Sequence, residues 1–158
     1  MRVSKEAAAA SRARIVAAAS RLLRERGVEA TSIADVMAAA GLTHGGFYKH
    51  FGSKDDLVAA AVGAAFAGHA ERFAERRAAL GAQVALRAYL DEYLSPEHVA
   101  HPGLGCPVAA LGAEAGRSSA AVADAFARGV EETIARFLTA APPGSDAATA
   151  RAAAIRRL

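Results

Sequence analysis

Alanine is the sequence feature that most restricts how this chain folds. It accounts for 45 of the 158 residues and leaves 39 larger members of the hydrophobic class. Alanine has the highest helix propensity of all residues, and the β-branched and aromatic residues that favour strands are sparse here. The composition therefore predicts an all-α fold with many small side chains in its core. It argues against sandwiches, barrels and doubly wound sheets.

A single cysteine and the lack of a long apolar segment exclude several classes of protein. One cysteine cannot form an intrachain disulfide or a cysteine-cluster zinc site. The longest apolar run, residues 57–68, is shorter than the ~18 residues that a membrane helix needs. Arg12 and Arg14 interrupt the segment where a signal peptide would have its apolar centre. We therefore expect a soluble, cytoplasmic protein without a metal site or a cofactor.

Positive charge is concentrated in the N-terminal third of the chain. Residues 1–60 contain nine Lys or Arg and six Asp or Glu, whereas residues 61–158 contain ten of each class. Such an uneven distribution favours a polyanionic partner, most often nucleic acid. The alternative is that these arginines form the solvated face of a helix, and charge alone does not separate the two interpretations.

Glycine, proline and capping residues divide the chain into eight predicted helices and no strands. Ser32 and Asp35 have the spacing of a capping box, and Pro107 suits the first turn of a helix. Residues 95–105 are expected to form a loop. The predicted helices cover approximately residues 4–26, 32–40, 44–51, 54–80, 83–94, 107–115, 119–138 and 145–158.

The second and third predicted helices have the pattern of a helix-turn-helix. Both are about two turns long, and the tight turn Gly41-Leu42-Thr43 joins them. Phe47 and Phe51 lie four residues apart, so one face of the third helix would pack on the first two helices. We predict a three-helix domain over residues 1–54, followed by a helical body over residues 55–158.

The string from Thr31 to Lys54 resembles the DNA-binding signature of the TetR family of bacterial repressors. The specific parts are Gly41, Phe47-Tyr48, His50-Phe51 and Ser53-Lys54, and the resemblance covers roughly residues 12–60. It implies a helix-turn-helix head that binds double-stranded operator DNA. It also implies a helical body that binds a small-molecule inducer and forms a homodimer.

The candidate DNA-binding residues follow from their chemistry and from the resemblance. The third helix presents polar groups that bond to DNA, and the two glycines within it either allow a close approach to DNA or relax a tight turn. The resemblance assigns phosphate contacts to Thr31, Ser32, Tyr48, His50 and Lys54. It assigns base-facing positions to His44, Gly45 and Lys49, and the candidate set also includes Thr43 and Gly46. Arg2 and Lys5 are candidates for a minor-groove arm, with a disordered tail as the alternative.

In the family, the helices of the body enclose the ligand pocket. The candidate lining residues in this chain are aromatic or titratable and come from three of the predicted helices. They are Phe66, His69, Phe73, Tyr89, Tyr93 and Phe126. Each of them is also a normal core residue, because aromatic side chains at helical spacing usually pack.

Cys106, the only thiol, stands just before Pro107 at the start of a predicted helix. The free N–H groups and the dipole of a helix N-terminus favour a thiolate, which makes Cys106 a candidate sensor of oxidants or electrophiles. The sequence around it also resembles one branch of the TetR family that has a Gly-Cys at this place. The alternative is a small buried residue that fills a gap between helices.

The C-terminal part departs from the family pattern. Family members usually continue for several tens of residues, and their last two long helices form the dimer interface. We therefore expect a weakened homodimer, with Ile155 and Leu158 at a subunit boundary or in a frayed helix. The stripe Val122, Phe126, Val130 and Ile134 is expected to be buried inside the subunit.

Two functions follow from these observations. The first is a ligand- or electrophile-responsive repressor of the TetR type. The alternative is a helical ligand-binding or interaction protein whose DNA-binding head is ineffective because the dimer bundle is incomplete. We do not expect an enzyme, because the sequence lacks a phosphate loop, an HExxH helix and a recognisable nucleophile-and-base arrangement.

Overall fold

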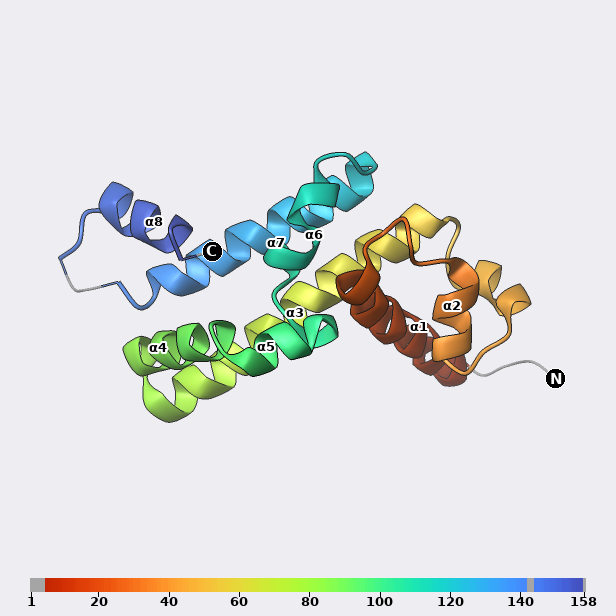
Figure 1. Ribbon diagram of the computed structural model, residues 1–158, viewed down its shortest axis with the longest axis horizontal. Helices are drawn as coiled ribbons and strands as arrows, with labels where there is room; N and C mark the ends of the chain where they lie inside the picture. Colours follow the sequence, from red (N-terminus) through yellow and green to blue (C-terminus); the bar gives the residue numbers. More distant parts are fainter. Residues whose placement is uncertain (1–4, 142–143, 158) are drawn as a thin grey trace.

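The computed structural model describes residues 5–141 and 144–157, and all regular structure in these ranges is helical (Figure 1). The predicted all-α fold is therefore confirmed. The helices are α1 (Lys5–Arg26), α2 (Ile33–Ala39), η1 (His44–Lys49), α3 (Lys54–Leu80), α4 (Ala82–Tyr93), α5 (Pro96–Ala100), η2 (Pro102–Leu104), α6 (Pro107–Ala115), α7 (Ala120–Leu138) and α8 (Ala147–Ile155).

Helices α1 and α2 begin and end where the sequence predicts. The Ser32 hydroxyl accepts a hydrogen bond from the Asp35 N–H, and the Asp35 carboxylate accepts one from the Ser32 N–H, which completes the predicted capping box. At the other end of α2, Gly41 has φ = 67°, a backbone conformation that residues with a Cβ rarely adopt. The tight turn between the two helices of the motif therefore depends on this glycine.

The third helix of the motif is a 3₁₀ helix, η1, rather than the predicted α-helix over residues 44–51. Its hydrogen bonds include those from the Gly46 N–H to the Thr43 carbonyl and from the His50 N–H to the Phe47 carbonyl. Adjacent glycines lower α-helix propensity, and a segment this short gains little from α-helix propagation. The tighter helix repeats every three residues, so Gly45 and Tyr48 lie along the same edge.

The long helix α3 connects the head, residues 5–53, to the body. It starts at the predicted domain boundary and packs against α1, α4 and α7. One cluster of buried side chains extends from α1 and α2 through the first half of α3 to α6 and α7. The division into two domains at residue 54 stays a prediction, since no linker separates the two parts.

The segment predicted as a loop, residues 95–105, contains two short helices. The Ser95 hydroxyl accepts from the His98 N–H and so caps α5, and Pro102 starts η2. Prolines at the first positions of both helices were a signal for them in the sequence. Gly103 is buried against α1, and a Cβ on it would come within 2.7 Å of Arg21 Cγ. The segment is therefore part of the contact between head and body.

Helix α7 is the centre of the body. Val122 and Ile134 are buried, and Phe126 and Val130 are half-buried and pack on the core, so the stripe lies inside the chain as predicted. Gly129 allows close packing, because a Cβ there would overlap the Phe66 ring of α3.

Helix α8 packs on α7 through Ala154, whereas Ile155 is 49% exposed. Leu158 lies outside the described residues. The expected subunit boundary at this end of the chain stays a prediction.

Candidate functional sites

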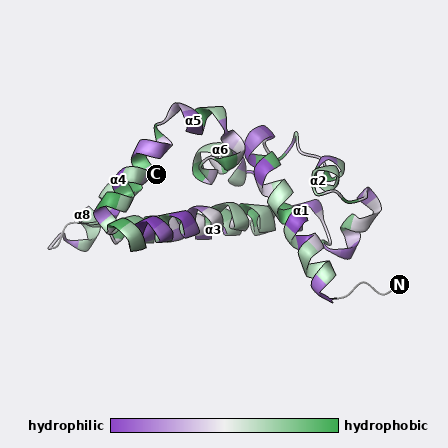
Figure 2. Cartoon of the chain, turned by 90° about the horizontal axis from the view of Figure 1, so that it is seen from below, coloured by the Kyte–Doolittle hydropathy of each residue, from purple (hydrophilic) through white to green (hydrophobic). Residues whose placement is uncertain are grey.

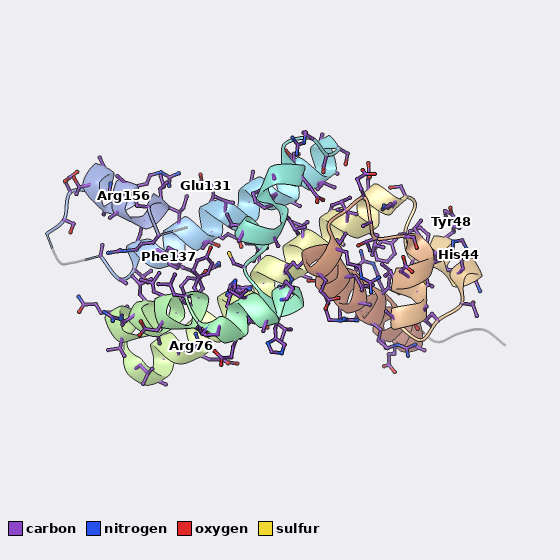
Figure 3. All side chains as sticks on the ribbon, in the orientation of Figure 1. His44, Tyr48, Arg76, Glu131, Phe137 and Arg156 are labelled. Atoms are coloured by element: carbon purple, nitrogen blue, oxygen red, sulfur yellow. The ribbon has the colours of Figure 1, made fainter. Side chains whose placement is uncertain are left out.

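The outer end of the head presents polar side chains around a buried aromatic anchor. Phe47 is fully buried, and its ring stacks on Phe51 with centroids 5.7 Å apart. The Tyr48 ring contacts the Phe47 ring edge-on, with centroids 5.1 Å apart, but is 68% exposed, and His44 is exposed as well (Figure 3). Lys49 is also exposed. The fold therefore places the predicted base-facing side chains at the far end of the molecule from the C-terminal helix.

The two glycines of η1 are not needed for the turn itself. Neither has a positive φ, and a Cβ added to Gly45 would meet no protein atom within 4 Å. A Cβ on Gly46 would make an ordinary contact with Met37 at 3.5 Å. The interpretation in which they relax a tight turn therefore has no support at Gly45. An open backbone remains there beside Tyr48 and Thr43, which is also exposed.

The four other predicted contacts differ in how they are placed. Ser32 is exposed and His50 is half-buried at the end of η1. Lys54 is half-buried, and its Nζ donates to the Val28 carbonyl at 2.9 Å. Thr31 is 2% exposed, and its hydroxyl donates to the Gly27 carbonyl at 2.7 Å. The prediction that Thr31 contacts phosphate is therefore corrected: its hydroxyl holds the turn after α1.

The arginines of α1 divide between two surfaces. Arg12 is exposed, and its guanidinium lies 4.7 Å from the centre of the Phe51 ring. Its positive charge therefore lies on the surface of the head. Arg21 pairs with Glu25 at 2.9 Å. Arg24 faces the body instead, where its Nη1 donates to the Gly105 carbonyl at 3.2 Å. Lys5 is exposed, and Arg2 lies outside the described residues.

Val28 links the head to two elements of the body. Its N–H donates to the Glu114 carboxylate of α6 at 2.6 Å, and its carbonyl accepts from Lys54 at the start of α3. A hydrogen bond to a charged group is stronger than one between neutral groups. Together with the Arg24–Gly105 bond, this contact ties the turn after α1 to the segment that carries Cys106.

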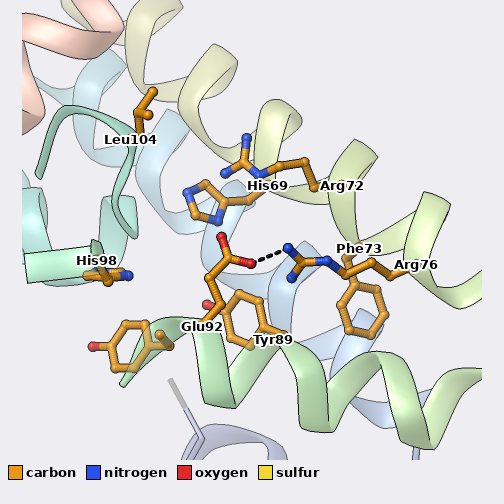
Figure 4. Close-up of a pocket in the computed structure, with 9 residues that line it drawn as sticks. His69, Arg72, Phe73, Arg76, Tyr89, Glu92, His98 and Leu104 are labelled. Atoms are coloured by element: carbon orange, nitrogen blue, oxygen red, sulfur yellow. Dashed lines mark hydrogen bonds and ion pairs between the residues drawn. The ribbon is translucent and has the colours of Figure 1, made fainter. Parts of the chain in front are cut away.

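The body contains two adjoining cavities beside α3 and α4, the first bordered also by α5 and η2 and the second by α6 and α7. They share His69, Phe73 and Tyr89, and their free volumes are about 20 and 10 Å³, which is room for about one water molecule each. Tyr93 lines the first and Phe66 the second. Figure 4 shows the first cavity, in which Glu92 and Arg76 form an ion pair across α4 and α3.

His69 is the central titratable group of this region. Its Nε2 lies 3.0 Å from the Gly105 carbonyl, the same oxygen that accepts from Arg24. Burial lowers the pKa of His69 to about 4, and the positive charge of Arg72 contributes to that lowering. The imidazole is therefore neutral near pH 7 and donates its N–H to Gly105.

Cys106 is the N-cap residue of α6 and is 6% exposed. Its sulfur lies 4.0 Å from the Tyr89 hydroxyl, within the wall of the second cavity. Burial and the neighbouring Cys106 raise the pKa of the Tyr89 phenol, which therefore stays protonated. The thiol both fills space beside α6 and borders a cavity, so the geometry is compatible with both predicted roles.

Phe126 does not join the other candidates. It contacts Phe66 edge-to-face, with centroids 5.5 Å apart, and lines neither of the two cavities. Its position favours the alternative of core packing, and its assignment to the ligand pocket stays a prediction. Sequence reasoning also missed Arg136 and Thr133 of α7, which line the second cavity. Their positions on the apolar side of an amphipathic helix were the available signal.

Comparison with known proteins identifies the head. A family model described as bacterial regulatory proteins of the tetR family matches residues 15–61, which include α2, η1 and the start of α3. The HTH-type transcriptional regulator TtgR of Pseudomonas putida is 45% identical over 60 residues, which are 38% of this chain and 29% of TtgR. The head of this chain is therefore a TetR-type DNA-binding domain. The resemblance predicted from the residues is thereby confirmed.

Two solved structures extend the similarity of fold to the body of this chain. A TetR-family transcriptional regulator from Cytophaga hutchinsonii has a TM-score of 0.79 at 19% identity, and the match covers 99% of this chain and 81% of that one. The reduced form of E. coli NemR has a TM-score of 0.69 at 23% identity, covering 82% of this chain and 68% of NemR.

The match to the curated relatives is shorter. The matched stretches span between 26% and 53% of the relatives' own lengths. These relatives are transcriptional regulators rather than enzymes. Within residues 5–141 and 144–157, no helix has the length and apolar character needed to cross a bilayer.

Proposed function

We propose that this chain is a TetR-type transcriptional repressor that binds operator DNA as a homodimer in the cytoplasm. The observation that carries the proposal is the exposed edge of η1, with Tyr48 and Lys49 held outward by the buried Phe47. A symmetric dimer would place two such edges about one helical turn of DNA apart, roughly 34 Å, on a near-palindrome.

Within this proposal the exposed side chains have two kinds of role. Ser32, Tyr48, His50 and Lys54 contact phosphates and provide affinity, and His44 and Lys49 face base edges and provide sequence preference. Thr43, Gly45 and Gly46 leave the backbone of the turn open for a close approach to DNA. The exposure of this surface and the open space at Gly45 support these assignments.

Selection of bound fragments from the genome of the source organism tests DNA binding directly. We expect recovery of near-palindromic promoter fragments, with binding that weakens as salt concentration rises. Failure to retain any fragment above random DNA, by a chain that is folded by circular dichroism, would contradict the repressor function. If that chain still bound small molecules, the alternative of a ligand-binding protein with an ineffective head would be favoured.

We further propose that the body senses a small molecule and passes the signal to the head through α6. This helix has Cys106 and Pro107 at the cavity and Glu114 at the head, and its nine residues span about 13 Å. A crevice of about 370 Å³ beside Glu114 leaves room for the helix to move. Opening of the cavity would displace α6 and so change the bond between Glu114 and Val28.

An electrophile is a second candidate signal, favoured by the position of Cys106 in the cavity wall. The similar NemR chain was solved in a form called reduced. With no other cysteine in the sequence, the response here would be an adduct, a sulfenic acid or a bridge between subunits. Because the thiol is buried, the reagent would have to wait for the cavity to open.

N-ethylmaleimide provides a trigger for testing both steps. We expect it to label Cys106 more slowly than a free thiol and to release operator DNA, whereas Cys106→Ser should keep DNA and ignore the reagent. Glu114→Ala should still be labelled but should release less DNA. The matched control is Asp124→Ala, which removes an exposed acid from α7. Labelling that leaves DNA binding intact would return Cys106 to a packing role.

A further inference from the structure

Arg136 of α7 is a charged side chain that forms no salt bridge within the described residues. It is half-buried, and its Nη2 donates to the Thr133 hydroxyl at 2.7 Å. In the described ranges, the four salt bridges involve Arg21, Arg76, Arg87 and Arg151, and none involves Arg136. Burial lowers the pKa of Arg136, as expected where water is removed from a cation without a full replacement.

The guanidinium lies beside an aromatic surface. Arg136 and Thr133 line the second cavity together with four aromatic rings. The rings of Tyr89 and Phe137 have centroids 5.3 Å apart, and those of Phe73 and Phe137 are 6.2 Å apart. The four rings belong to Phe66, Phe73, Tyr89 and Phe137.

The surrounding polar groups do not supply the missing negative charge. His69 is neutral near pH 7, and the Tyr89 phenol stays protonated. In the adjoining cavity Glu92 is paired with Arg76, and Arg72 lies beside His69 (Figure 4). Glu132 precedes Arg136 by one helical turn and raises its pKa, but the two form no salt bridge. The cavity region therefore has an excess of positive charge.

We propose that the body of this chain binds aromatic carboxylic acids, with Arg136 as the counter-ion. The carboxylate would accept from the Arg136 guanidinium, and the ring of the ligand would lie among the four aromatic rings. The proposal rests on the ligand-sensing function above and names the chemical class of the ligand. Because the cavity now has room for about one water molecule, α4 or the aromatic side chains move apart when the acid enters.

The test uses 2-naphthoate and its neutral counterpart, 2-naphthamide, with affinities measured by isothermal titration calorimetry. We expect the wild-type chain to bind naphthoate about tenfold more tightly than the amide, because only the carboxylate forms a charge-assisted hydrogen bond with Arg136. Arg136→Gln should bind the two probes equally and keep the wild-type affinity for the amide. The matched control is Arg128→Gln, which removes an exposed arginine from the same helix and should keep the preference.

Three results would overturn the proposal: equal binding of the two probes by the wild type, no binding of either, or an unchanged preference in Arg136→Gln. If Arg136→Gln does not fold, Arg136→Lys keeps the charge but lacks the planar fork, and its preference for naphthoate should fall between the other two. DNA retention by the probe-free wild type is measured separately. If the chain binds DNA but neither probe, only the proposed ligand class is wrong. If it binds no DNA, the proposed repressor function is wrong.

Discussion

The two halves of α3 pack against very different surroundings. The first half has buried side chains at six positions: Leu57, Val58, Ala61, Val62, Ala65 and Phe66. Beyond Phe66, only Phe73 is buried, and the helix exposes Arg72 and half-buries His69 and Arg76. The hydropathy of the helix changes accordingly, from a hydrophobic stretch in the first half to a hydrophilic stretch in the second, before the apolar residues at its end (Figure 2).

This difference separates two tasks along one helix. The first half joins the head to the body through one continuous cluster of buried apolar side chains, which holds the DNA-binding element in place. The second half borders small cavities among aromatic and charged groups. Fewer buried side chains hold the helices together there, so these cavities can widen more easily. We therefore expect stability to reside in the first half and ligand response in the second.

The largest effect is expected from truncating the anchor of the head. Phe47→Ala should lower the free energy of unfolding by about 3–5 kcal/mol, because it empties a fully enclosed site. Phe73→Ala at the cavity end should lower it less, since the neighbouring rings can move into the space. Urea denaturation measures both variants. Equal losses would mean that the two halves of α3 are packed equally well.

The second prediction concerns pH at the cavity end. The unfolded chain takes up a proton at His69 below about pH 6.5, whereas the folded chain resists protonation until about pH 4. Stability should therefore fall as pH drops from 6.5 to 4, by about 3 kcal/mol at most. His69→Gln should lack this part of the pH dependence in thermal melts. The same change at exposed His101 is the control, and a common slope in both variants would contradict the burial of His69.

The third prediction concerns the first residue of α3. Lys54→Ala should weaken binding to all DNA sequences and reduce the slope of log K against log salt by about one unit, as expected for one lost phosphate contact. It should also lower stability by about 1 kcal/mol, because the bond to the Val28 carbonyl is lost. Lys49→Ala should change sequence preference instead. A wild-type salt slope in Lys54→Ala would mean that Lys54 makes no phosphate contact and acts only through its bond to Val28.

The smallest effect on stability is expected at Gly45. Gly45→Ala should stabilise the chain by about 0.5–1 kcal/mol, because the added methyl meets no protein atom and the glycine loses more entropy on folding. Its DNA affinity should nevertheless decrease, as measured by fluorescence anisotropy. Gly63→Ala in α3 has the same open space and should stabilise equally without any change in DNA binding. An unaffected affinity in Gly45→Ala would remove Gly45 from the interface.

Local sequence patterns predicted most of the helices. The Ser32–Asp35 capping box, the glycine at the turn and the stripe on α7 all act within one or two helical turns, so they can be read along the chain. The prediction of a loop over residues 95–105 was wrong, because Ser95-Pro96 and Pro102 start helices of only five and three residues. Periodicity is not visible over such short lengths.

The helical class, the TetR-type head and the packing of Phe47 and Phe51 in the head could all be predicted from the amino-acid sequence. The polar contacts between distant segments could not, because they arise when the helices pack. Arg24, one of the basic residues of the N-terminal third for which we expected a DNA-facing or solvated position, instead bonds to Gly105. Thr31 was expected to contact DNA but its hydroxyl bonds to Gly27, Phe126 packs on Phe66, and Arg136 was overlooked. Helical periodicity gives the face on which a side chain lies, but the partner it meets depends on how the helices pack.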